Sequence, residues 1–172
     1  MKSLKELCAN VLVDAGKTAD QDLASAPKEL AAFVKDCEAA KGKEALKSNE
    51  AVDLEKNGKA ILLYFQMKAE KWQKLQSETG VLLKHPPVSE TDKKTVLEQI
   101  QKLKGKAAKA QAKYAEFDRK AQSAFESAKL KRFTKLKIPD DLQFKVNTYA
   151  SNGESACLAV VQMCTKLEAS LK

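Results

Sequence analysis

The stretch VLEQIQKLKGKAAKAQAKYAEFDRKAQSAFESA, residues 96–128, decides the fold. Small or apolar residues recur through it at spacings that alternate between four and three. This alternation keeps their side chains on one face of an α-helix, as in the heptad repeat of long packed helices. The stretch therefore predicts one long helix with a continuous buried seam. The seam consists of Val96, Ile100, Leu103, Ala107, Ala110, Tyr114, Phe117, Ala121, Ala124 and Ala128.

The composition of the rest of the chain also predicts an all-α protein. The 172 residues include only 6 Gly and 4 Pro, so residues that break helices are rare. We expect an elongated antiparallel helical bundle with coiled-coil-like helices, folded as a single domain over 1–172. Its elements would be two short helices within 1–42 and three long helices at 43–80, 90–136 and 139–171.

Local signals predict where these helices begin and end. Ser3 and Glu6 have the spacing of a capping box at the start of the first helix. Gly16 is expected to end that helix, and Asn57-Gly58 to bend or split the first long one. Pro139 is expected to begin the last helix, because proline suits a first turn.

The middle of the 96–128 seam is rich in alanine, which leaves room on that face of the helix. A partner helix must therefore approach closely or bring large side chains. Trp72 and Phe65, on the predicted inner face of the 43–80 helix, are the candidates.

Positive charge is concentrated in one part of the chain. The whole chain carries a net charge of +8, and residues 81–138 alone carry 15 basic and 6 acidic residues, a net of +9. Such a concentration predicts a surface that meets something acidic. The candidate binding residues form two dense groups: Lys102, Lys104, Lys106, Lys109 and Lys113, and then Lys129, Lys131, Arg132, Phe133, Lys135 and Lys137.

An acidic protein partner, bound by a scaffold or adaptor, is the interpretation that we prefer for these groups. An anionic membrane surface or a lipid is the alternative, and nucleic acid ranks last because only Arg119 and Arg132 are arginines. Simple solvation of a helix end is the plainest explanation. Within KLKRFTKLK, residues 129–137, the exposure of Phe133 decides: a buried ring makes the stretch structural, and an exposed ring makes it a binding site.

No pattern in the chain predicts catalysis, a cofactor or a metal. His85 is the only histidine, which leaves Ser-His or Cys-His catalysis and histidine-containing metal sites hard to assemble. Gly16-Lys17-Thr18 resembles the end of a phosphate-binding loop, but Val11 stands where that loop requires glycine. We expect a non-enzymatic protein. The 4 cysteines, expected to be reduced and packed, are Cys8, Cys37, Cys157 and Cys164.

Two resemblances point to partners. The segment SLKELCANVL, residues 3–12, resembles the elongin B/C-binding box of ubiquitin-ligase adaptors, which implies that Leu4, Cys8 and Leu12 insert into elongin C. The same spacing is typical of any capped amphipathic helix. The basic long-helix outline resembles BAR-type membrane-binding modules in architecture only, and 172 residues is short for that family.

The distribution of apolar residues bears on location. The start MKSLKELCAN is charged and lacks the apolar run of a secretory signal. The longest apolar run, 60–65, is far shorter than a membrane span. We expect a cytoplasmic protein, peripheral to membranes at most, and self-association through the helical seams stays open.

Overall fold

A computed structural model describes residues 2–19, 27–85 and 88–172. Within these ranges the regular structure consists of five α-helices and one short 3₁₀ turn, η1, so the all-α prediction is confirmed. The elements are α1 (Leu4–Ala19), α2 (Lys28–Ala40), α3 (Ser48–Leu83), α4 (Glu90–Ala128), η1 (Leu130–Arg132) and α5 (Leu142–Leu171).

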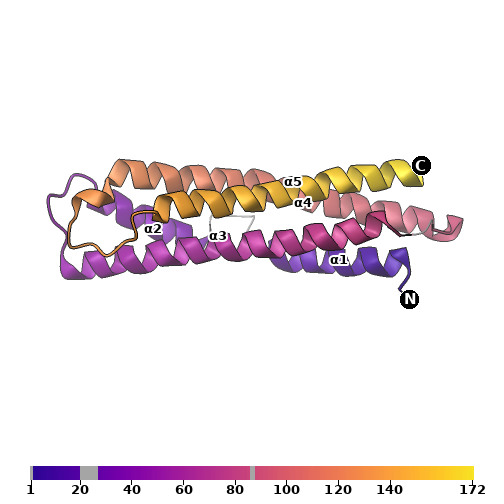
Figure 1. Ribbon diagram of the computed structural model, residues 1–172, viewed down its shortest axis with the longest axis horizontal. Helices are drawn as coiled ribbons and strands as arrows, with labels where there is room; N and C mark the ends of the chain where they lie inside the picture. The colour runs from indigo at the N-terminus through magenta and orange to yellow at the C-terminus, as the bar shows by residue number, and fades with distance from the viewer. Residues whose placement is uncertain (1, 20–26, 86–87) are drawn as a thin grey trace.

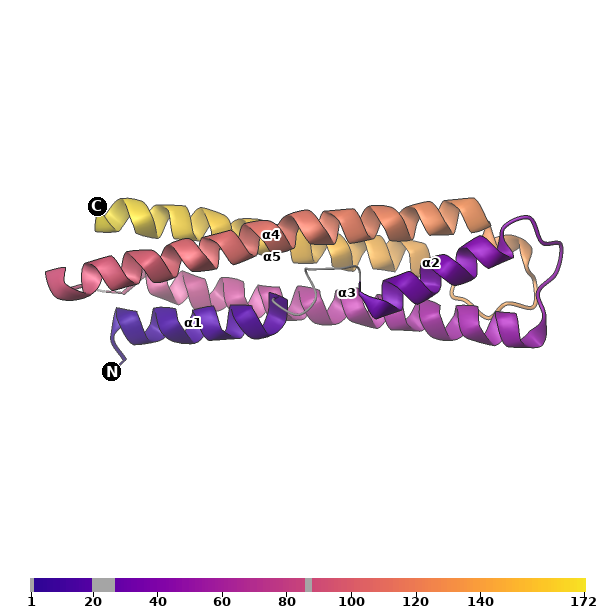
Figure 2. The same cartoon turned by 180° about the vertical axis from the view of Figure 1, so that it is seen from behind.

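The helices form an elongated bundle in which α1 and α2 lie end to end, in the place of one long helix (Figure 1). α5 packs along both α3 and α4, while α1 and α2 pack against the other sides of α3 and α4. The order around the bundle is therefore α1 and α2, α3, α5, α4, which places α3 and α4 at opposite corners. Figure 2 shows α1 and α2 from the other side, alongside the full length of α3.

The directions of the long helices agree only in part with the prediction of antiparallel packing. α4 and α5 are antiparallel neighbours, as expected, but α3 and α5 run in the same direction (Figure 1). The reason is that α1 and α2 lie between α3 and α4. The connection from α3 to α4 therefore joins opposite corners of the bundle and does not close a hairpin of adjacent helices.

The seam of the 96–128 stretch lies in the core. All of its residues are buried, and the most exposed of them, Ala124, is 7% exposed. Near the middle of the bundle, Trp72 of α3 donates its indole N–H to the hydroxyl of Tyr114 of α4 at 3.0 Å. Gly153 of α5 lies beside this pair, where a Cβ atom would be 3.7 Å from the Tyr114 ring. Large side chains thus fill the space that small residues leave, as predicted for Trp72.

The start of α1 agrees with the prediction and its end does not. The Ser3 backbone N–H donates to the Glu6 carboxylate at 3.0 Å, and the Glu6 N–H donates to the Ser3 hydroxyl at 3.2 Å, so the capping box is confirmed. The helix continues past Gly16 to Ala19. Packing explains the extension, since Thr18 is buried and its carbonyl accepts a hydrogen bond from the Lys68 ammonium at 2.7 Å.

Asn57-Gly58 does not interrupt α3. Gly58 is buried where α3 approaches α5, and a Cβ atom there would lie 3.1 Å from Leu142 Cδ2. The glycine therefore permits a close approach of two helices, while the Asn57 amide donates to the Asp36 carboxylate of α2. The helix also continues past the expected end at Gly80 to Leu83, because Leu82 is buried in the core.

The connection between the last two long helices differs from the prediction of helix to residue 136. α4 ends at Ala128, because Lys129 adopts a left-handed conformation with φ 49° and turns the chain across the end of the bundle. α5 begins at Leu142, with Asp141 as its N-cap, and not at Pro139. It then runs unbroken to Leu171.

Asp118 of α4 is a buried acid at the contact with α5. Its carboxylate accepts hydrogen bonds from the Asn147 amide at 2.8 Å and from the Gln122 amide at 3.2 Å. Burial raises the pKa of Asp118 above its ordinary value, although both hydrogen bonds act in the opposite direction. Burial, together with the nearby charge of Asp118, also raises the pKa of Glu154. The folded state therefore favours the neutral form of both acids.

We expect Asp118→Asn to raise the free energy of unfolding at neutral pH by about 0.5–1 kcal/mol, a modest gain because two hydrogen bonds partly stabilise the buried carboxylate. A raised folded-state pKa means that ionisation destabilises the fold above the unfolded-state pKa of about 4, so between about pH 3 and pH 7 the effect is absent at the lower end and present at the upper end. The asparagine amide of the variant carries no charge. The exposed Asn147 side chain can rotate so that its hydrogen bond with this amide is kept. Urea denaturation at both ends of that pH range checks this. An equal gain at both ends would contradict the explanation.

Candidate functional site

Residues 129–137 form a turn across one end of the bundle, between α4 and α5 (Figure 1). We call this segment the basic tip. It begins at Lys129, whose left-handed backbone is uncommon for a residue with a side chain. The short η1 turn follows, and the Phe133 N–H donates to the Leu130 carbonyl at 3.1 Å. The tip therefore has a defined backbone conformation.

The apolar side chains of the basic tip point into the molecule. Leu130 is 7% exposed and Phe133 is 8% exposed, while Leu136 is partly buried against the core. Phe133 is therefore not the exposed binding residue that the sequence analysis considered, and by the criterion stated there the apolar part of the stretch is structural. Only the lysines around it remain candidates for binding. The spacing of the apolar residues off the 96–128 seam reflects the turn of the chain, which lays them over the end of the core.

Arg132 connects the basic tip to the end of α2 and to the start of the link between α2 and α3. Its guanidinium donates to the Ala40 carbonyl at 2.8 Å and to the Lys43 carbonyl, and its Nε donates to the Ala128 carbonyl at 3.4 Å. The same group lies over the Phe133 ring, 4.1 Å from its centre. Three of its five N–H donors are therefore engaged within the protein, and its charge still adds to the local field.

We expect Arg132→Ala to lower the free energy of unfolding by about 1–3 kcal/mol, because three main-chain carbonyls lose hydrogen bonds from a charged donor. Arg132→Lys should recover little of this loss, since one ammonium cannot replace the planar fork that reaches several carbonyls. Urea denaturation of the three proteins checks both expectations. A lysine variant as stable as the natural protein would show that Arg132 acts only through its charge.

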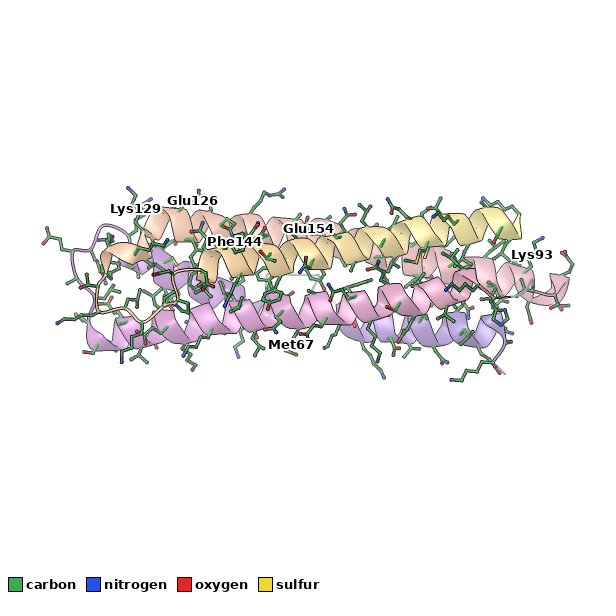
Figure 3. All side chains as sticks on the ribbon, viewed as in Figure 1. Met67, Lys93, Glu126, Lys129, Phe144 and Glu154 are labelled. Atoms are coloured by element: carbon green, nitrogen blue, oxygen red, sulfur yellow. The ribbon has the colours of Figure 1, made fainter. Side chains whose placement is uncertain are left out.

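The lysines of the basic tip point to solvent. Lys129, Lys131, Lys135 and Lys137 are all exposed, and their ammonium groups form no ion pair with any residue that the structure describes. Figure 3 shows Lys129 at this end of the bundle, with Glu126 one turn before it on α4. The backbone N–H of Lys137 donates to the Glu55 carboxylate at 2.6 Å, which fixes the end of the tip against α3.

The lysines of the other predicted group, in the middle of α4, point to different sides of that helix. Lys104 lies toward α5, with its ammonium 3.7 Å from the Glu168 carboxylate. Lys113 pairs with Glu116 on the same helix at 3.2 Å. Lys106 is half-buried, whereas Lys102 and Lys109 are exposed and, seven residues apart, share one side of α4. These lysines do not form one patch, and the basic tip is the denser surface.

The basic tip also forms the wall of a pocket with a volume of about 520 Å³. Phe125, Leu130 and Phe133 supply apolar surface, and Lys129 and Lys131 also line it. The sequence did not indicate this pocket, because it depends on a turn where helix was expected.

Phe144 is a further residue that the sequence analysis missed. This aromatic side chain of α5 is 71% exposed, whereas Leu142 and Val146 on either side of it are buried. Its labelled position in Figure 3 lies along α5, near the start of that helix. Phe144 lies between two residues of the predicted buried face of the last helix and does not belong to that face. A phenylalanine at such a position was the sequence signal that could have identified it.

The residues of the elongin-type segment belong to the core. Leu4 and Cys8 are each 3% exposed, and Leu12 is partly buried. Their insertion into a partner would require α1 to leave the bundle. Leu4 and Cys8 are therefore not presented on the surface.

The cysteines are four buried, free thiols. Burial raises the pKa of Cys8 to about 11 and, with the charge of Asp36 adding to it, that of Cys37 to about 12. Thiols with such values stay protonated and react slowly. Within the described ranges, no group of three or more His, Cys, Asp and Glu side chains could hold a metal ion.

No protein-family model, curated protein or solved structure matches the chain. Its function is therefore inferred from its own geometry. In the part of the chain that the structure describes, no helix has the length and apolar character to cross a bilayer.

Proposed function

We propose that this protein is a non-enzymatic interaction module, a scaffold or adaptor, whose basic tip binds an acidic segment of a partner protein. The observation that supports the proposal is that different side chains of the tip hold the turn and face solvent. Its apolar side chains and Arg132 hold the turn in place, while four exposed lysines surround it without ion-pair partners among the described residues. A held turn loses less conformational entropy on binding than a mobile segment.

The chemistry of lysine favours clustered carboxylates as the ligand. Each ammonium is a point charge on a flexible stem, which adapts to Asp and Glu side chains of varied geometry. Arg132, the one arginine in the tip, has its donors engaged with the protein's own carbonyls. A planar bidentate contact of Arg132 with a phosphate group would therefore compete with these carbonyls.

Poly-L-glutamate is a suitable probe for this proposal. Replacing the four tip lysines, Lys129, Lys131, Lys135 and Lys137, with glutamine should weaken its binding about fourfold or more, at about 0.2–1 kcal/mol for each exposed charge contact. Fluorescence anisotropy of labelled probe at about 0.02 M salt measures the affinity, and about 0.5 M salt should remove most of the binding.

A matched control changes the same net charge at the opposite end of the bundle. Lys84, Lys94, Lys166 and Lys172 are also exposed, and their replacement by glutamine should weaken binding less than about threefold. Equal losses in the two variants would contradict the proposed site. Binding to vesicles that contain phosphatidylserine, without binding to poly-L-glutamate, would favour the membrane-surface function in its place.

A further inference from the structure

The pocket at the basic tip has the lining expected of a site for an alkyl chain. Its volume of about 520 Å³ is within the range of small-molecule sites. Phe125 and Phe133 are each 8% exposed and Leu130 is 7% exposed, whereas Phe65 and Phe117 of the central core are 1% exposed. Phe125, Leu130 and Phe133 all line the pocket. They therefore face the pocket with only a small part of their surface, which is the apolar area that a ligand can contact.

The charges around the pocket favour an anion over a cation. Lys129 and Lys131 line it and are exposed, and Arg132 adds a third positive charge. Glu126 and Asp140 also line the pocket, so its lining carries a net charge of +1. Lys135 and Lys137 follow directly in the chain. Lys129 and Lys131 therefore favour an anionic group beside them, whereas Glu126, one turn before Lys129, opposes it.

We propose that the tip pocket binds the anion of a medium-chain fatty acid. The alkyl chain contacts the pocket-facing edges of Phe125, Leu130 and Phe133, and the carboxylate lies between the ammonium groups of Lys129 and Lys131. This site goes beyond the proposed binding of an acidic protein segment, because its ligand is a small molecule and its affinity depends on chain length.

Isothermal titration of the full chain with hexanoate, octanoate and decanoate, below the concentration at which micelles form, tests the proposal. Binding should saturate at one ligand per chain and tighten about two- to fourfold with each added methylene group. Decyltrimethylammonium has the same tail with a positive head and should bind at least about tenfold more weakly than decanoate.

Two sets of variants locate the site. Replacing Lys129 and Lys131 with glutamine should weaken decanoate binding about three- to tenfold, whereas Glu126→Gln should strengthen it. The same replacement at Lys84 and Lys94, at the other end of the bundle, is the matched control and should change nothing. Thr134 lines the pocket and is exposed, so Thr134→Trp should fill the pocket and abolish binding while the helical circular dichroism stays unchanged.

Three results would overturn the proposal. The first is an absence of saturable decanoate binding to the natural protein. The second is equal affinity for the anionic and cationic ten-carbon probes, which would indicate a nonspecific apolar surface. The third is unchanged decanoate binding in a correctly folded Thr134→Trp variant, which would place the ligand elsewhere.

Discussion

Replacing Trp72 with alanine is expected to lower the free energy of unfolding by about 3–5 kcal/mol, the range for deleting a large aromatic side chain from a packed core. Trp72 is fully buried and is the only tryptophan in the chain. Its ring reaches across the bundle from α3 to the opposite corner, where its N–H donates to Tyr114 at 3.0 Å. The substitution therefore removes both packing and a hydrogen bond between helices that are not neighbours.

Trp72→Phe separates these two contributions. Phenylalanine keeps much of the apolar volume but has no N–H donor, so we expect a loss of about 1–2 kcal/mol. Circular dichroism during urea denaturation is the suitable measurement, because both substitutions remove the only tryptophan fluorophore. A loss of less than about 1 kcal/mol for Trp72→Ala would mean that this diagonal contact is not packed as described.

A small and a large side chain at position 153 are expected to have opposite effects on the free energy of unfolding. Gly153→Ala should raise the free energy of unfolding by about 0.5–1 kcal/mol, because alanine favours helix and its Cβ would make only ordinary contacts. That Cβ would lie 3.7 Å from the Tyr114 ring and 3.8 Å from Ala69 Cα. A leucine would extend from there against the backbone of α3. We therefore expect Gly153→Leu to cost about 3 kcal/mol, at the upper end of the range for overpacking.

Gly105 provides the matched control for this pair. It lies on an exposed part of α4, and a Cβ atom there would meet nothing within 4 Å. Gly105→Leu should therefore stabilise the protein by about 0.5–1 kcal/mol through helix propensity alone. Thermal and urea denaturation of the variants measure these changes. A Gly153→Leu variant as stable as Gly105→Leu would contradict the close approach of α3 and α5.

The long helices could be predicted because burial repeats along them. The 96–128 seam alternates regularly, and each of its positions lies in the core. The structural role of a single glycine could not be predicted, because a glycine can either end a helix or permit close contact between two helices. Gly58 and Gly153 lie at contacts with α5 and α3 respectively, and only the packed bundle distinguishes them from breaks.

The basic tip was located by its charge, but its internal arrangement depends on contacts distant in sequence. Arg132 looked equivalent to the lysines around it, yet its partners include the Ala40 carbonyl at the end of α2. Lysine is not a residue that signals a left-handed turn, so the end of α4 at Lys129 was missed. The division of the mid-α4 lysines followed from where α5 places Glu168. These features arise from the order of helices around the bundle, which the periodicity of each helix does not specify.

The most direct test of the basic tip as the interaction surface is to map where poly-L-glutamate contacts the protein. Backbone ¹H–¹⁵N chemical shifts of the full chain would be followed during titration at low salt. The proposed function predicts that the largest changes occur within 129–137 and that the opposite end, around Lys84, Lys94 and Lys166, changes little. Changes of equal size at both ends, or larger changes at the opposite end, would contradict it.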